Sequence, residues 1–64
     1  MDVWKQYEGK KVYVILKNQR QYSGKCVEVA DTGNNLFFIT ILDKFNKFVT
    51  FLNSEIEMIQ EEVI

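Results

Sequence analysis

From residue 11 onward the chain consists mainly of short segments rich in apolar residues, in which a period of two places alternate residues on the same face. Such alternation is typical of β-strands that bury one face, and β-branched and aromatic residues dominate these segments, as they do in sheets. In KVYVILK, Val12, Val14 and Leu16 share one face and Tyr13 and Ile15 the other, so this predicted strand is apolar on both faces. The pattern predicts five strands within residues 10–60, covering residues 11–17, 20–31, 36–43, 47–53 and 56–60.

Short turn signals separate the predicted strands and make neighbouring strands antiparallel. Asn18 and Gln19 supply a two-residue turn, DTGNN follows the second strand, DKFN marks the next hairpin tip, and Ser54 opens a one-turn segment before the last strand. The second strand is long and carries Gly24 in its interior, where strands usually kink or bulge. A strand bent there can belong to two sheets at once.

The first residues follow a different pattern, because apolar side chains at Val3, Trp4 and Tyr7 fit the spacing of a helix that ends at a glycine. We expect a short helix over residues 1–8, which must pack on the sheet because two turns are unstable alone. The predicted fold is therefore all-β with a short N-terminal helix. Five short strands most readily form a small, strongly bent antiparallel barrel, since closure removes exposed strand edges.

The size of the chain limits how it can be stabilised. Its 64 residues contain no proline and no linker-like tract, so we expect a single domain over residues 1–64. A chain this short buries only about 60% of its unfolded surface. A lone Cys26 and the absence of histidine argue against a disulfide or a metal site, which leaves oligomerisation as the common remaining route. An apolar content of 47% is consistent with contacts between subunits.

The opening MDVWKQYEGKK is charged throughout, and no stretch approaches the ~18 consecutive apolar residues of a membrane span. The sequence thus predicts a cytoplasmic protein without membrane contact. Cys26 is then expected to be a reduced thiol in the core or at a subunit contact.

Charge is uneven along the chain although the net charge is only −1. This total gives no global attraction to nucleic acid, so any attraction must be local. Basic residues concentrate in the first half, at Lys10, Lys11, Lys17, Arg20 and Lys25, and acidic residues near the end, at Glu55, Glu57, Glu61 and Glu62. The basic group either forms a face that follows phosphates or is simply a solvated surface.

No residue pattern indicates an enzyme. The chain has no histidine, no nucleophile with a base nearby in sequence, no glycine-rich phosphate loop and no metal-ligand spacing. We therefore expect no catalysis, no cofactor or metal, and no small-molecule substrate.

The segment GKKVYVILKNQRQYSGKCVEVADTGNNLFF resembles the first sequence motif of the Sm and Sm-like (Lsm) family, and the resemblance extends from residue 9 to residue 59. It implies a bent five-stranded barrel, rings of about six or seven subunits, and pore-facing loops that bind uridine-rich single-stranded RNA. Pairing of the fourth strand of one copy with the fifth strand of the next would generate such a ring. The matching positions are Gly9, Val12, Val14, Leu16, Arg20, Tyr22, Gly24, Val27, Asp31, Asn35 and Leu36.

The resemblance also implies an RNA-binding loop. In the family motif D-x-x-M-N the Asp orients the Asn, whose amide contacts a base edge, and Asp31 and Asn35 occupy these two positions. A carboxylate can hold an amide in one orientation and leave its other groups for a base. The RNA-binding residues expected on this basis are Asp31, Asn35, Asn34, Asn53 and Lys25.

Three positions depart from the family pattern. Gly33 replaces the ring that stacks on a base, Asn34 replaces the Met, and FLNS at residues 51–54 replaces the Arg-Gly of the second motif. Stacking contributes about 1–3 kcal/mol per base, so Asn53 or a nearby aromatic residue would have to substitute. The alternatives are that DTGNN is only a turn, and that the protein is an oligomeric scaffold or protein-interaction barrel without RNA binding.

Most aromatic residues are expected to pack in the core or between subunits rather than to stack on bases, because they lie in strands with apolar neighbours. Phe37, Phe48 and Tyr13 belong to this group. Phe45 is the exception, because it lies at a predicted hairpin tip, where a ring normally has little to pack on.

Overall fold

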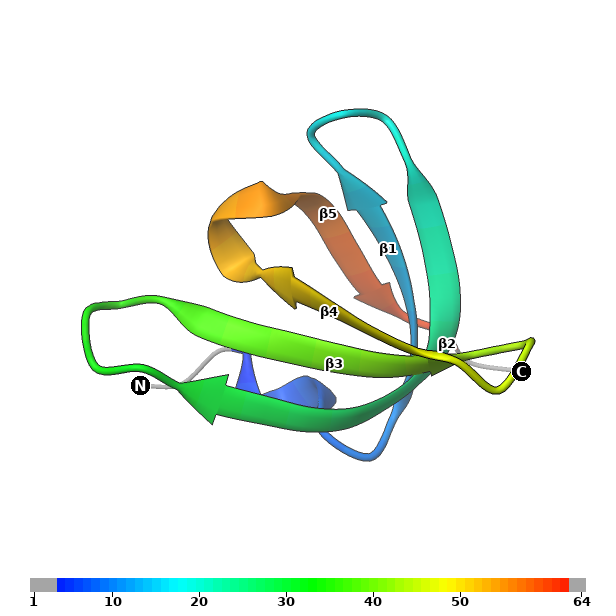
Figure 1. Ribbon diagram of the computed structural model, residues 1–64, viewed down its shortest axis with the longest axis horizontal. Coiled ribbons are helices and arrows are strands. Elements are labelled where there is room, and N and C mark those ends of the chain that lie inside the picture. The colour runs from blue at the N-terminus through cyan, green and yellow to red at the C-terminus, as the bar shows by residue number, and fades with distance from the viewer. Residues whose placement is uncertain (1–3, 63–64) are drawn as a thin grey trace.

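One antiparallel sheet of five strands makes up most of the computed structural model, which describes residues 4–62 (Figure 1). The five predicted strands are confirmed, each with its bounds within one residue of expectation, and so is the single turn before the last strand. The elements are η1 (Lys5–Tyr7), β1 (Lys11–Leu16), β2 (Gln21–Asp31), β3 (Phe37–Asp43), β4 (Phe48–Leu52), η2 (Asn53–Glu55) and β5 (Ile56–Glu61).

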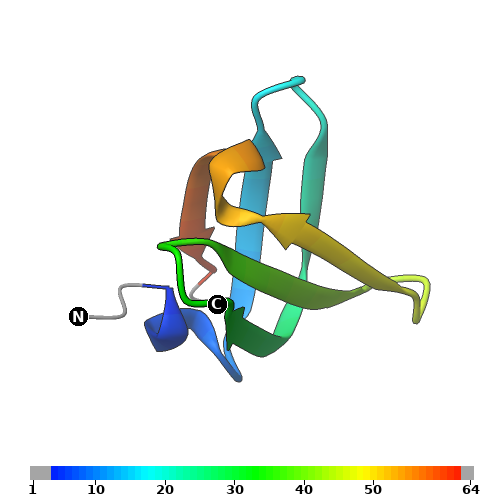
Figure 2. The same ribbon diagram turned by 60° about the vertical axis from the view of Figure 1, so that its left-hand side comes forward.

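The long strand β2 joins the two halves of the sheet, whose order is β4-β3-β2-β1-β5. Its first half pairs with β1 and its second half with β3 (Figure 2). Gly24 pairs with both Val12 and Asp43. A Cβ atom at Gly24 would overlap the carbonyl oxygen of Leu42, so glycine is required by the close approach of β3. The register shift lies slightly further on, between Cys26 and Glu28. The expected bend of β2 is thus confirmed.

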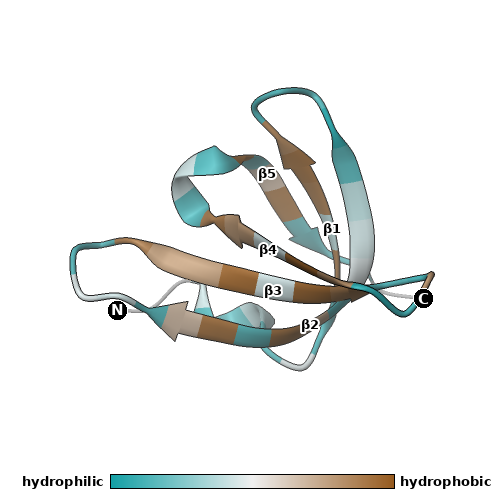
Figure 3. Ribbon diagram, viewed as in Figure 1, coloured by the Kyte–Doolittle hydropathy of each residue, from teal (hydrophilic) through white to brown (hydrophobic). Residues whose placement is uncertain are grey.

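The core lies on the concave side of the bent sheet and is formed by alternate residues of the strands, as the period-two pattern requires. Most of β1, β3 and β4 is hydrophobic, whereas the turns between β1 and β2 and between β2 and β3 are mostly hydrophilic (Figure 3). Cys26 is fully buried in this core, as a free thiol. The buried residues are Val12, Val14, Leu16, Cys26, Val29, Phe37, Ile39, Ile41, Phe51 and Ile56.

The expected helix over residues 1–8 is not found in the described part of the chain, where Lys5–Tyr7 forms a single 3-10 turn. Residues 1–3 lie outside the described residues. The turn ends early because the following backbone extends along β2: the Gly9 N–H donates to the Cys26 carbonyl at 2.7 Å, and the Cys26 N–H donates to the Lys10 carbonyl at 2.7 Å. Trp4 and Tyr7 pack against the core, as expected of the helix they were assigned to.

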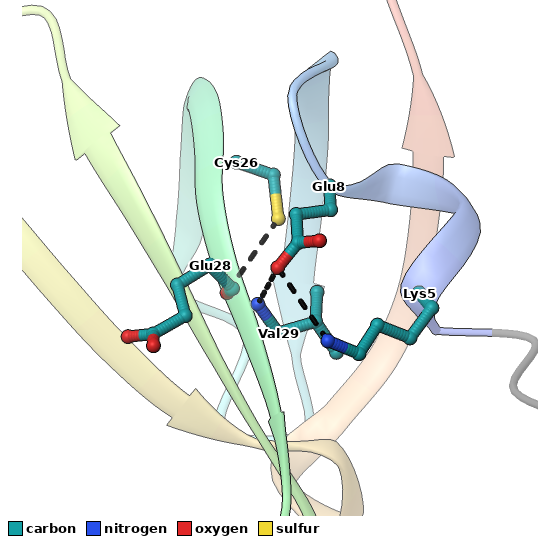
Figure 4. A network of polar contacts seen from close by, with 5 residues as sticks. All are labelled: Lys5, Glu8, Cys26, Glu28 and Val29. Carbon is teal, nitrogen blue, oxygen red and sulfur yellow. Dashed lines mark hydrogen bonds and ion pairs between the residues drawn. The ribbon is translucent and has the colours of Figure 1, made fainter.

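A carboxylate completes this attachment of η1 to β2. Strand β1 pairs with β2 only as far as Lys25, so the same edge of β2 needs other partners further along. The Glu8 Oε2 atom accepts a hydrogen bond from the Val29 N–H at 3.0 Å and lies 3.7 Å from the Lys5 Nζ atom (Figure 4). The segment before β1 thereby covers an edge of β2 that would otherwise be open.

The expected closure into a barrel is not observed within residues 4–62. Strands β4 and β5 are the two ends of the strand order and are not hydrogen-bonded to each other. They meet only through η2, the three-residue connection between them (Figure 1). The sheet is therefore strongly bent but open, with one edge at β4 and one at β5. No helix in residues 4–62 has the length and apolar character needed to cross a membrane.

Candidate nucleic-acid interface

The loop of residues 32–36 connects β2 to β3 at one end of the sheet (Figure 1, left). Its backbone is held by its own side chains. The Asp31 Oδ1 atom accepts a hydrogen bond from the Gly33 N–H at 2.8 Å, and the Thr32 hydroxyl donates to the Leu36 carbonyl at 2.7 Å. The turn chemistry expected of DTGNN is therefore present.

Two residues of the loop adopt positive φ angles, which strand residues avoid. Gly33 has φ of 99° and Asn35 has φ of 59°. Glycine meets the first requirement without strain, and asparagine is among the few other residues that tolerate the left-handed region. The sequence NN following glycine thus fits the backbone that this turn needs.

Asn53, the first residue of η2, clamps the loop from the far side. Its Nδ2 atom donates to the Asn35 carbonyl at 3.0 Å, and its Oδ1 atom accepts from the Phe37 N–H at 3.1 Å. The structure thus places Asn53 beside the loop, but its amide oxygen and one amide N–H are already engaged with the backbone. The side chain of Asn53 therefore serves mainly to hold the loop backbone in place.

Three predicted site residues present their side chains at the loop surface. Asp31, Asn34 and Asn35 are all exposed. Among the described residues, the Asp31 carboxylate bonds to the Gly33 N–H and makes no hydrogen bond to the Asn35 amide. The two asparagine amides make no side-chain hydrogen bonds within residues 4–62, so their donors and acceptors face solvent.

Apolar side chains lie next to the loop on the face of the sheet opposite the core. Leu36 is 39% exposed and Phe38 is 42% exposed. Phe38 pairs with Leu52 of β4 and with Ala30 of β2. Phe38 is the exposed aromatic residue nearest to the loop along the described chain.

Lys25, the remaining predicted site residue, lies apart from the others. It precedes Asp31 by six positions along β2, a separation of at most about 20 Å at the usual rise of a strand, since the register of β2 shifts between them. Its register partners are Lys11 of β1 and Leu42 of β3. The structure therefore brings together Asp31, Asn34, Asn35 and Asn53, and places Lys25 near the bend of the sheet.

Nothing else in the described residues suggests a reactive or metal-binding centre. Burial raises the pKa of the Cys26 thiol. A hydrogen bond with the Glu28 backbone opposes this rise in part, and the nearby Glu8 carboxylate adds a smaller rise. Residues 4–62 contain no group of three or more potential metal-ligating side chains.

Comparisons with protein-family models, with curated proteins and with solved structures return no match.

Proposed function

We propose that this chain is a divergent Sm-like subunit that assembles into a ring and binds single-stranded RNA weakly through its β2–β3 loop. The observation that carries the proposal is the clamped loop. Its backbone is tied down by Asp31, Thr32 and Asn53, while the Asn34 and Asn35 amides are left without partners in the described chain.

The clamp favours binding because it orders the loop in advance. A flexible loop loses conformational freedom when it captures a ligand, and this loss reduces affinity. Here five hydrogen bonds already hold residues 31–37, two of them from Asn53. Asn34 and Asn35 thus need to order little more than their own side chains.

The exposed groups suit the edges of unpaired bases. A primary amide offers two donors and an acceptor, which can pair with the Watson–Crick edge of a base in a single strand. The second oxygen of Asp31 is a further acceptor. Phe38 supplies an exposed ring, and stacking on such a ring contributes about 1–3 kcal/mol per base. The net charge of −1 keeps the expected affinity low.

Ring assembly is supported by the two open edges of the sheet. In an antiparallel ladder, residue pairs that exchange hydrogen bonds alternate with pairs that do not. Asp43 and Lys47 form a bonded pair, because the Asp43 N–H donates to the Lys47 carbonyl. Phe48 and Thr50 therefore belong to non-bonded pairs, and their backbone N–H and C=O groups point away from β3. On β5, the Glu62 N–H donates to the Lys11 carbonyl. By the same alternation Ile59 belongs to a non-bonded pair, and its backbone N–H and C=O groups point away from β1.

Pairing of β4 in one subunit with β5 in the next would satisfy both rows of backbone groups. It would continue the bent sheet from subunit to subunit and complete the small-barrel arrangement that one chain leaves open. Subunits joined head to tail in this way form a closed ring when the rotation between neighbouring subunits is a whole fraction of a full turn. Phe48, 70% exposed on β4, would then be covered.

The test is fluorescence anisotropy with labelled hexauridine and hexaadenine, comparing the wild type with the Asp31→Ala/Asn35→Ala variant. A matched control is Glu28→Ala/Gln6→Ala, which also removes one carboxylate and one amide, both from exposed positions outside the loop. We expect at least a five-fold loss of affinity in the loop variant and none in the control. Equal affinities in all three proteins would refute RNA binding by the loop.

A scaffold without RNA binding is the second candidate. Gly33 has no ring to stack on a base. The Asn53 amide is bonded to the loop backbone and so does not replace the arginine of the family's second motif. A stable ring that binds neither oligonucleotide would support this candidate.

A further inference from the structure

A groove runs past the bend of the sheet, at the end of β3 opposite the β2–β3 loop. One part has a volume of about 360 Å³ and lies between Tyr13 and Gln21 on one side and the β3–β4 hairpin tip on the other. A second part, of about 550 Å³, contains Lys11 and Lys25. Both parts are lined by Ser23, Asp43 and Lys44, so they form one continuous surface, called the bend groove below.

The first part of the bend groove is aromatic. Phe45 lies at the tip of the β3–β4 hairpin and is 70% exposed, and the Lys44 Nζ atom lies 5.3 Å from the centroid of its ring. The Tyr13 hydroxyl donates to the Gln21 Oε1 atom at 2.7 Å. This bond fixes the Gln21 amide and leaves its N–H groups as donors. The exposed ring, the tyrosine and the amide together suit a planar heterocycle with acceptor atoms at its edge.

The second part is basic. Lys11 and Lys25 are direct neighbours across β1 and β2, an arrangement of like charges that costs stability. Neither lysine, nor Lys44, forms an ion pair with any residue between 4 and 62. An anion between these ammonium groups would relieve their repulsion.

The acidic residue of the bend groove does not neutralise this charge fully. Asp43 lines the groove together with three lysines, and its Oδ1 atom already accepts hydrogen bonds from the Phe45 N–H at 2.8 Å and the Lys47 N–H at 3.0 Å. Its carboxylate is therefore used to shape the hairpin that carries Phe45. The groove retains a net positive charge beside an exposed ring.

We propose that the bend groove is a second binding site for single-stranded RNA, in which a base packs between Phe45 and Tyr13 and the adjoining phosphate lies against Lys11, Lys25 and Lys44. The ligand class rests on the proposed function, but the residues of the β2–β3 loop are not involved. The site also gives Lys25 a role in the part of the sheet where it lies, near the bend.

The first experiment measures anisotropy of labelled hexauridine and hexaadenine at several salt concentrations. The groove variants are Lys11→Gln/Lys25→Gln and Phe45→Ser, and the matched control is Lys17→Gln/Lys47→Gln, which removes the same charge from exposed positions that do not line the groove. We expect Phe45→Ser to lower affinity about five-fold or more. Loss of two phosphate contacts should reduce the slope of log affinity against log salt by about 1.4. Equal effects of the two lysine pairs would overturn the proposal.

A second experiment locates the bound strand directly. Photo-cross-linking with a 4-thiouridine oligonucleotide, followed by peptide mass spectrometry, should label the peptides that contain Tyr13 or Phe45, and Phe45→Ser should remove the label at the hairpin tip. Cross-links confined to residues 31–38 would overturn the groove and leave the loop site standing. Cross-links confined to the groove would support this proposal and refute the loop. An absence of binding to either oligonucleotide would refute both sites.

Discussion

The amide nitrogen of Asn53 donates a hydrogen bond to the carbonyl oxygen of Asn35 at 3.0 Å, across 18 positions of sequence. The same amide accepts a hydrogen bond from the Phe37 N–H, so one side chain fastens both the loop and the start of β3. The loop that presents Asn34 and Asn35 is therefore built by two segments of the chain. Its shape depends on η2 as much as on its own residues.

Removal of the Asn53 clamp should destabilise the fold. The Asn53→Ala variant leaves the partly buried Phe37 N–H without its acceptor, and an unsatisfied group of this kind costs about 1–3 kcal/mol. Urea unfolding measures the change in free energy. Asn34→Ala is the matched control, because this exposed amide makes no side-chain hydrogen bond in the described chain and its loss should change stability little. Equal stabilities of the two variants would contradict the clamp.

Two glycines should respond to alanine for different reasons. At Gly24 the added Cβ overlaps the Leu42 carbonyl, so the strands must separate, and we expect a loss of about 3 kcal/mol or more, or failure to fold. At Gly33 there is free space but φ is 99°, so the loss should be about 1–2 kcal/mol. Thermal and urea unfolding compare the two variants. A larger loss at Gly33 than at Gly24 would contradict the close approach of β2 and β3.

The bond between Glu8 and Val29 should be separable from the charge of Glu8. Glu8→Ala removes the acceptor of the Val29 N–H and should cost about 1–2 kcal/mol. Glu8→Gln keeps an acceptor oxygen and loses only the charge and its exposed contact with Lys5, so its cost should be smaller. Unfolding in urea measures both. Equal losses would assign the effect to the charge instead of the hydrogen bond.

Cys26 should make stability depend on alkaline pH. Because burial raises its pKa in the folded state, the folded protein holds the thiol proton more tightly than the unfolded chain. The buried thiol's contribution to the free energy of unfolding is fully present below the ordinary thiol pKa of 9.0. This contribution is lost as the pH rises above that value, by at most about 1.4 kcal/mol per pH unit. The free energy of unfolding should therefore fall more steeply above pH 9 in the wild type than in Cys26→Ala. Parallel curves would contradict the burial of a protonated thiol.

The β4 edge should be essential for assembly but not for folding. Proline at an outward-facing position of an edge strand removes a free N–H without breaking the ladder inside the subunit. Thr50→Pro should therefore retain the far-UV circular dichroism of the wild type but lose the ring in sedimentation velocity. Thr50→Val is the control, because it keeps the N–H and removes only the hydroxyl contact with Thr40 at 3.0 Å. A Thr50→Pro protein that still forms the wild-type oligomer would refute pairing through β4.

The sequence predicted the strands well because period-two alternation is a local property. Val12, Val14 and Leu16 are buried where the pattern placed them, and Gly24 lies at the bend. The helix was wrong because Val3, Trp4 and Tyr7 match a helical spacing, whereas the backbone from Gly9 is drawn into hydrogen bonds with Cys26. That contact joins residues far apart in sequence and leaves no local signal.

The candidate site was only partly predictable for the same reason. Turn-forming residues identified the loop at Asp31 and Asn35, but the engagement of Asn53 with that loop depends on the three-dimensional path of η2. The bend groove left one local sign, the aromatic Phe45 at a hairpin tip. Its neighbours Tyr13 and Lys11 come from a different strand, and only the bend of β2 brings them beside the hairpin.

Native mass spectrometry of the purified protein, with and without ribonuclease treatment, shows whether the chain forms a ring that carries single-stranded RNA. We expect one discrete oligomer whose mass includes a component that ribonuclease removes. A monomer in both samples would contradict the ring, and a discrete oligomer without any nuclease-sensitive mass would contradict its role in RNA binding.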